Sequence, residues 1–211
     1  GTANNTVFNV SNRTVNAAGN INLTNLDTFT QTDSTFIFDG TTNFTTNDMT
    51  INSIQVGTTT AAGSLTLLDS LDINGNLSVG TANNTVFNVS NRTVNAAGNI
   101  NLTYLDTFTQ ADSTFIFDGT TNLTSAGRFF NNVQIGTAAG GGELITTDNM
   151  NVDGTFTFMD GGPTTFNISD DMVFISSSDL DLSPLDTFTV TDSTLVFDGT
   201  TNLTTNGFAF F

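Results

Sequence analysis

Hydrophobic and polar residues alternate along the chain in short stretches. At residues 35–38 the sequence TFIF places Phe36 and Phe38 on one face, which is the period-two pattern of a strand. Gly, Asn and Asp separate such stretches and predict frequent turns. In the middle of the chain the expected strands are 65–67, 71–73, 77–79, 86–89, 100–102, the neighbourhood of Phe108, and 115–117. No stretch shows the 3.6-residue period of a helix, so the pattern predicts an all-β protein.

The pattern itself is repeated. The sequence LDTFTQTDSTFIFDGTTN at residues 26–43 returns at 105–122 as LDTFTQADSTFIFDGTTN and at 185–202 as LDTFTVTDSTLVFDGTTN. The copies begin at Leu26, Leu105 and Leu185, so their spacing is almost constant. This periodicity divides the chain into a partial repeat (1–56), a complete repeat (57–135) and a diverged partial repeat (136–211). We expect all three in one continuous structure, cut from a longer array.

Two all-β folds fit a repeat of this length. One is a row of immunoglobulin-like β-sandwich modules, and the other is a parallel β-solenoid, in which each coil of the chain stacks on the last. Sandwich modules need longer strands and linkers, whereas this chain has only two prolines, Pro163 and Pro184, and no linker-like segment. We therefore predict a solenoid with about 20 residues per coil and about four coils per repeat. Tandem sandwich modules are the alternative.

The composition indicates what fills the solenoid. The chain contains 20 Phe, no Trp and one Tyr, Tyr104. Each fully buried Phe contributes roughly 1.5–3 kcal/mol, so a row of stacked Phe is expected to form much of the core. Asn and Thr suit turns and strand faces, where stacked copies can hydrogen-bond along the axis as ladders.

The charge balance excludes several partners. The chain contains three arginines (Arg13, Arg92, Arg128) and twenty acidic residues but no Lys or His, so its net charge is −17. Such a chain offers phosphate no basic surface, so neither nucleic acid nor an anionic membrane is an expected partner. It has no Cys and hence no disulfide framework or thiolate site. No apolar run approaches the ~20 residues of a membrane span.

Three stretches have sequences that are typical of long repeat proteins: NVSNRTVNAAGNINLTNLDTF at 9–29, STFIFDGTTN at 34–43 and LTLLDSLDINGNLSVG at 65–80. They resemble the repeats of very long bacterial surface proteins of the β-solenoid, filamentous-haemagglutinin-like kind. The resemblance implies an extracellular or cell-surface location and a fibrous, structural or adhesive role. It implies no catalytic residues.

Recurring aspartates are candidate calcium ligands, because calcium favours carboxylate and carbonyl oxygens. They are Asp33, Asp39, Asp112, Asp118, Asp192 and Asp198, with Asp170, Asp171, Asp179 and Asp181 as additional acids of the third copy. The calcium-binding nonapeptide and the EF-hand loop are both missing from the sequence. Asp before Gly or Ser ordinarily forms a turn, which is the favoured interpretation. We expect no cofactor and no metal site, with calcium as the alternative.

Other chemistry finds little support in the sequence. Paired carboxylates also serve glycosidases, but without His or Lys the chain lacks a base and a basic sugar clamp, so no enzyme activity is expected. Thr-x-Thr pairs suggest an ice-binding face, yet they recur once per repeat rather than on every coil, and strand propensity explains them. These pairs are Thr28/Thr30, Thr107/Thr109 and Thr187/Thr189. Sequons, including those at Asn9, Asn12, Asn43 and Asn202, are glycan acceptors in form.

The leading hypothesis is structural. The chain is expected to be a segment of an extracellular filament or surface fibre, built by coil stacking and by head-to-tail contact with identical units. The alternative is an adhesin stalk or a module that binds glycans or surfaces. Near-identical copies favour a spacer, whereas the diverged residues 136–181 are where a binding face is expected under the alternative.

Overall fold

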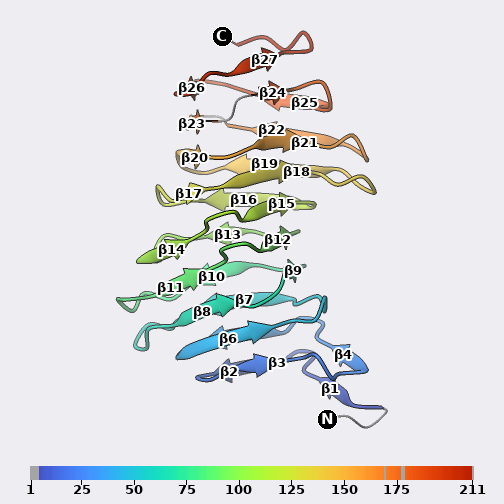
Figure 1. Cartoon of the computed structure of the whole chain (residues 1–211), viewed down its shortest axis with the longest axis vertical. Coiled ribbons are helices and arrows are strands. Elements are labelled where there is room, and N and C mark those ends of the chain that lie inside the picture. Colours follow the sequence, from blue (N-terminus) through green and yellow to red (C-terminus); the bar gives the residue numbers. More distant parts are fainter. Residues whose placement is uncertain (1–4, 169, 177–178, 211) are drawn as a thin grey trace.

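The fold is a stack of coils. The structure, a computed structural model, describes residues 5–168, 170–176 and 179–210, and these contain 27 short strands and no helix. All ladders between the named strands are parallel, and the coils rise as one rod with the described ends at opposite tips (Figure 1). The predicted parallel β-solenoid is confirmed, and the alternative of tandem sandwich modules is wrong.

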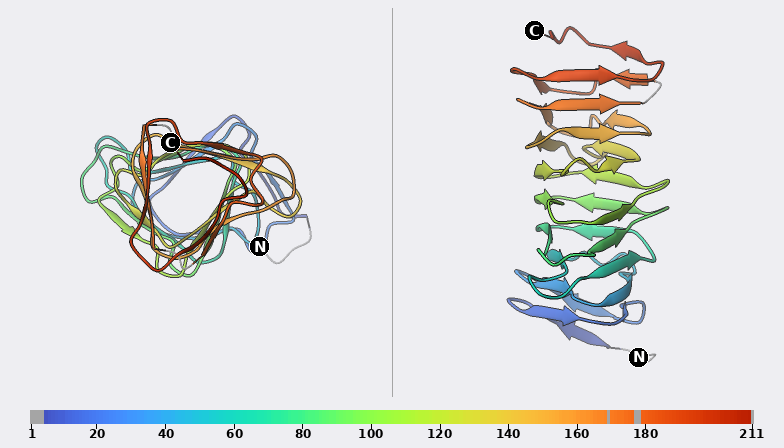
Figure 2. Two further views of the ribbon diagram at one scale, coloured as in Figure 1. Left: turned by 90° about the horizontal axis from the view of Figure 1, so that it is seen from above. Right: turned by 90° about the vertical axis from the view of Figure 1, so that its left-hand side faces the viewer.

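Three faces surround the axis, as the view along the rod shows (Figure 2). The first face is a nine-stranded sheet that takes one strand from each coil and contains strands of all three repeats. In order it consists of β2 (Thr14–Ala17), β5 (Thr35–Phe38), β7 (Ser53–Val56), β10 (Leu77–Val79), β13 (Ile100–Asn101), β16 (Thr120–Thr124), β19 (Gly142–Thr146), β22 (Thr164–Asn167) and β25 (Thr187–Thr189).

Chain order assigns the remaining strands to two further faces, each made of shorter sheets. The second face holds β3 (Ile21–Asn22), β6 (Thr41–Thr45), β8 (Ser64–Leu67), β11 (Val86–Asn88) and β14 (Thr107–Thr109), then β17 (Phe129–Phe130), β20 (Met150–Val152), β23 (Met172–Ile175) and β26 (Thr194–Phe197). The third face holds β1 (Val7–Asn9) and β4 (Thr28–Thr30), then β9 (Leu71–Ile73), β12 (Thr93–Ala96), β15 (Thr114–Phe117), β18 (Asn132–Ile135) and β21 (Phe156–Phe158), then β24 (Asp179–Asp181) and β27 (Asn202–Thr204).

Most coils are slightly longer than the sequence predicts. Leu77 lies opposite Ile54 in one neighbouring coil and opposite Ile100 in the other. At the same corner, Asn76 and Asn99 are hydrogen-bonded across a separation of 23 residues. Ser113 and Asn132, also bonded between adjacent coils, are only 19 residues apart, so the coils are not uniform. The strand pattern predicted a shorter average because it underestimated the residues spent in the corners between faces.

The repeat does not match a whole number of coils. The strand TFIF of the first copy is β5 in the nine-stranded sheet, whereas its equivalents β15 and β26 lie in sheets of the other two faces. From β5 the chain returns to the nine-stranded sheet at β7, β10 and β13 before it reaches β15. A repeat therefore spans between three and four coils, instead of the expected four. Equivalent residues of the three copies consequently never stack in one column.

The core is built of inward-facing Phe, as predicted, but not as one row. Phe36 and Phe38 are both completely buried. The Phe rings form three clusters, with the centroids of neighbouring rings 4.9–6.4 Å apart. The clusters are Phe8, Phe29, Phe36, Phe38 and Phe44; Phe87, Phe108, Phe115 and Phe130; and Phe156, Phe158, Phe166, Phe188, Phe208 and Phe210. Buried aliphatic residues such as Leu71 and Leu144 fill the coils between them.

The glycine of the FDG sequence is required by the neighbouring coil. A Cβ atom on Gly40 would lie 2.4 Å from the carbonyl oxygen of Ala18, and one on Gly119 would lie 2.3 Å from that of Ala97. Both obstacles are backbone atoms of the preceding coil, which cannot rotate away. The glycine thus allows two corners to touch.

Gly40→Ala is expected to lower the free energy of unfolding by about 1–3 kcal/mol, the usual cost of overpacking. Gly19→Ala is the matched control on the opposing corner, because a Cβ atom there meets nothing within 4 Å. It should leave the free energy unchanged or raise it slightly. Urea unfolding followed by circular dichroism measures both values. Equal effects of the two substitutions would contradict the close approach of the corners.

Candidate functional site

Half of the recurring aspartates have a turn role that needs no metal. Asp33, Asp112 and Asp192 adopt left-handed backbone conformations, with φ of 53°, 54° and 51°. Asp and Asn tolerate this region better than other residues with a side chain. The turn interpretation from the sequence is therefore confirmed at these three positions.

The other recurring aspartates follow equivalent strands on three different faces. Asp118 Oδ2 accepts a hydrogen bond of 2.8 Å from Asn95 Nδ2, and Asp198 Oδ1 accepts one of 2.8 Å from Ser176 Oγ. Asp39 comes after β5, on a third face from these two. Among the described residues, no three acidic groups gather closely enough to hold a metal ion.

The additional acids of the third copy also form turns or accept hydrogen bonds from neighbouring residues. Asp170 is another left-handed residue, with φ of 65°, and Asp171 Oδ2 accepts a bond of 2.8 Å from Thr146 Oγ1. Asp179 Oδ1 accepts one of 2.6 Å from Asn202 Nδ2 in the next coil. Hydrogen bonds from the hydroxyl and the amide of Ser183 lower the pKa of Asp181 below its ordinary value of 3.8. A lowered pKa contributes stability above that ordinary value, which is lost as the pH falls through the folded value.

The aspartate of the LDTFT sequence joins neighbouring coils, although it was not among the predicted candidates. In each repeat its Oδ2 accepts a hydrogen bond from a backbone amide 21 or 22 residues earlier. The bonds are Thr6 N to Asp27 at 2.6 Å, Thr85 N to Asp106 at 2.9 Å, and Thr164 N to Asp186 at 2.8 Å. The unchanged LDTFT in all three copies was the signal available from the sequence.

Two further carboxylates connect corners. Asp69 accepts bonds from the amides of Thr46 and Asn47, at 2.9 and 2.7 Å. Asp148 does the same for the amides of Ser125 and Ala126, at 2.7 and 2.6 Å. Each carboxylate thus caps a turn 22 or 23 residues earlier in the chain. Charge-assisted bonds of this type are stronger than bonds between neutral groups.

Asparagine forms the expected axial ladder at one corner. Asn76 Oδ1 accepts a bond of 3.0 Å from the amide of Asn99, and Asn99 Oδ1 accepts one of 2.9 Å from the amide of Asn122. The equivalent contact on the second face joins Asn20 and Asn43, whose amide donates to Asn20 Oδ1 at 2.8 Å. The abundant Asn and Asp side chains therefore bind their own neighbouring coils.

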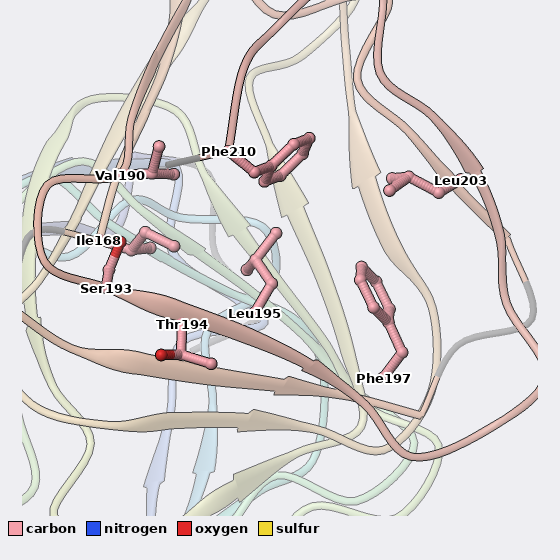
Figure 3. A pocket seen from close by; sticks show the side chains of 8 residues that line it. All are labelled: Ile168, Val190, Ser193, Thr194, Leu195, Phe197, Leu203 and Phe210. Carbon is pink, nitrogen blue, oxygen red and sulfur yellow. The ribbon is translucent and has the colours of Figure 1, made fainter.

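A cavity of about 340 Å³ lies at the C-terminal end of the stack (Figure 3). Apolar side chains of β26, β27 and the segment that follows point toward it, among them Leu195, Leu203 and Phe210. Within the described residues no strand pairs beyond β26 or β27. Among the described residues that line the cavity, Ser193 and Thr194 are polar and the others are apolar.

Equivalent residues show how the end differs from the interior. Phe117, Leu123 and Phe130 are completely buried in the middle of the rod. Their counterparts in the third copy are Phe197, Leu203 and Phe210, which are 36%, 40% and 40% exposed. The sequences are nearly the same, so the difference arises from the coil that covers one set and not the other.

The stacked parallel coils define this chain as a β-solenoid repeat protein. Comparisons with protein-family models, with curated proteins and with solved structures find no match. In the part of the chain that the structure describes, no helix has the length and apolar character needed to cross a membrane.

Proposed function

We propose that this chain is a structural segment of an extracellular filament or surface fibre, acting as a rod whose length is set by the number of coils. One observation carries the proposal: the nine-stranded sheet runs without a break through nine coils and all three repeats. A continuous backbone ladder resists extension along the axis, because separating the ends requires breaking parallel strand pairs on the nine-stranded face and on at least one other face.

The use of the repeated residues supports a spacer and not a catalyst. Residues 1–45 and 80–124 differ at only three positions: Asn25/Tyr104, Thr32/Ala111 and Phe44/Leu123. The shared residues form turns, close contacts between corners and hydrogen bonds between coils, as Asp106 and Gly119 illustrate. A net charge of −17 keeps such rods soluble and discourages side-by-side clumping. The filamentous-haemagglutinin-like resemblance adds the extracellular location to the proposal.

A specific surface feature favours the alternative, an adhesin stalk or a module that binds glycans or surfaces. The diverged third copy has Phe174 where the first two have Asn16 and Asn95. Phe174 faces outward on β23 and lies opposite Asn151 of β20. Asn151 in turn lies opposite Phe129 of β17, which is 52% exposed, so the three residues form one column. This column gives sugar rings an apolar surface beside an amide.

Electron microscopy of the purified native material tests the structural role. Long fibres with an axial layer line at ~4.8 Å, the spacing of stacked strands, are expected. Discrete particles joined by flexible necks, without such a line, would refute it. A glycan array separates the alternative: saturable binding that Phe174→Asn abolishes would favour the binding module. This substitution restores the residue of the other two copies, so the fold should tolerate it.

A further inference from the structure

We infer that an outward column of three side chains on the second face, Phe129, Asn151 and Phe174, binds a neutral polysaccharide that lies along the axis of the rod. The ligand class is an extended chain of β-1,4-linked sugar rings. This assignment rests on the binding module proposed above as the alternative function, and it adds the kind of glycan and its direction on the rod.

The three side chains lie on three successive coils of the stack. Phe129 of β17 lies opposite Asn151 of β20, and Asn151 lies opposite Phe174 of β23. The three strands are neighbours in one sheet and follow one another up the rod (Figure 1). Phe129 is exposed, and the other two side chains are partly exposed on the outer side. Because neighbouring strands lie about 4.8 Å apart, the two Phe are separated by roughly 10 Å, with the amide midway between them.

The same column exists one repeat earlier, where it is polar and hydrogen-bonded within the chain. The equivalents of the three residues, each 79 positions earlier in the sequence, are Thr50, Asp72 and Asn95. They also lie on successive coils. Thr50 Oγ1 donates a hydrogen bond of 2.6 Å to Asp72 Oδ2, and Asn95 Nδ2 donates one of 2.8 Å to Asp118 Oδ2. The polar groups of this earlier column are therefore already paired.

The three replacements in the later column act in one direction. Two polar side chains become outward aromatic rings, and the carboxylate of Asp72 becomes the amide of Asn151, so the column loses its charge. Within the described residues, the side chain of Asn151 makes no hydrogen bond, whereas that of Asn95 does. Both the donor and the acceptor of the Asn151 amide are consequently free for a ligand.

A β-1,4-linked sugar chain matches these groups in chemistry and in spacing. Each ring has apolar C–H faces, which pack on aromatic side chains, and hydroxyl groups, which bond to amides. The chain is an extended ribbon in which every second ring presents the same face. Two sugar units span nearly the separation of the two Phe, so the outer rings of a trisaccharide stack on Phe129 and Phe174. The middle ring then lies at Asn151.

Charge restricts the ligand to neutral glycans. The three residues of the column carry no charge, but Asp153 is exposed two residues after Asn151, and the whole chain has a net charge of −17. Arg128 precedes Phe129, yet its guanidinium donates to backbone carbonyl groups of the preceding coil. This surface repels an anionic polysaccharide, whereas a neutral one meets no such repulsion.

Isothermal titration calorimetry on the 211-residue protein with cellohexaose and chitohexaose, both neutral, tests the site. One binding site per chain is expected. Cellobiose is too short to reach both rings and should bind at least about tenfold more weakly than cellotriose. Phe129→Thr and Phe174→Asn restore the residues found one repeat earlier. Each should weaken binding about three- to tenfold, because one stacked ring is lost.

Tyr104→Asn is the matched control for these variants. Tyr104 is an aromatic residue outside the column that is 53% exposed, and Asn25 occupies its place in the first copy. Its replacement should leave the affinity unchanged. A loss equal to that of Phe129→Thr would mean that the column is not the site.

A transplanted site provides the converse experiment. Thr50→Phe, Asp72→Asn and Asn95→Phe together copy the later column into the earlier repeat, and two binding sites per chain are expected. Circular dichroism confirms that each variant is folded. A folded triple variant that still has one site would overturn the inference, as would unchanged affinity in Phe174→Asn. If the triple variant does not fold, the two restoring variants decide.

Other outcomes identify a different occupant. Binding of anionic polygalacturonate or α-linked maltohexaose, but not of the β-1,4-linked probes, would overturn the ligand class while leaving a binding module. Oligomers of the free protein that Phe129→Thr dissociates would assign the column to a second copy. If no glycan binds, both the inference and the binding module fail, whereas fibres with the ~4.8 Å layer line would still support the structural role.

Discussion

Phe130→Ala is expected to lower the free energy of unfolding by about 3–5 kcal/mol, the usual cost of emptying a buried Phe site. Phe130 is completely buried, and its ring lies 5.7 Å from that of Phe108 and 5.0 Å from that of Phe115. It therefore holds together the central cluster, in which edge-to-face pairs add about 0.5–1.5 kcal/mol each beyond area burial. The total stability of most domains is only about 5–15 kcal/mol.

The neighbouring residue is the control. Phe129 is 52% exposed on the outer side of the same strand, so Phe129→Ala should change the free energy by no more than about 0.5 kcal/mol. Urea unfolding monitored by circular dichroism measures both variants. Similar losses at both positions would mean that the inward and outward sides of β17 are wrongly assigned. Phe130→Leu should recover part of the loss, because Leu refills most of the cavity.

The sequence predicts strand faces well where inward residues are large and apolar. The alternation of Phe36 and Phe38 gives both the strand and its inward side. It fails at β16, where Thr121 faces inward beside Leu123. Thr121 is completely buried, and its hydroxyl donates to the carbonyl oxygen of Gly98 at 3.1 Å. An inward Thr whose partner lies in another coil has no period-two signature, so that strand was not predicted.

The bonds between coils could not be predicted for a related reason. The contact between Asp106 and the amide of Thr85 spans 21 residues, and only the true length of the coil brings the two groups together. The spacing of the repeated sequences gives the period of the repeat but not of the coil. A coil of about 20 residues would make the repeat about four coils long, which would place equivalent aspartates on one face. The structure distributes Asp39, Asp118 and Asp198 over three faces.

Deleting residues 57–135 should leave a folded, shorter rod. The deletion removes one complete repeat and joins Val56 to Gly136. In the shortened chain β7 comes directly before β19, which is the position of β18 in the full chain. β6 then lies beneath β19, where β16 lies in the full chain. β6 and β16 have the sequences TTNFT and TTNLT, so the inward positions under Leu144 stay similar in kind. The rod should shorten by three to four coils, or about 14–19 Å.

This result depends on the relation between the repeat and the coil. The strand before the junction is on the nine-stranded face in β7 but on the third face in β18. All coils after the junction must therefore rotate about the axis of the rod by one face relative to the coils before it. Nearest-neighbour contacts, on which solenoid stability mainly depends, are unchanged by that rotation. An unchanged circular dichroism signal per residue and a single unfolding transition at a somewhat lower temperature are the expected observations.

A slightly smaller deletion supplies the control. Removing residues 57–131 keeps four more residues but joins Val56 directly to Asn132. β7 and β18 then become one strand of eight residues without the corner between them, whereas each face has room for about four. Continuous alternation would carry the chain past the edge of the face, so this variant should aggregate or lose its β-sheet signal. If both deletion variants fold equally well, the stack does not depend on the corners, and the assignment of the repeat to between three and four coils is wrong.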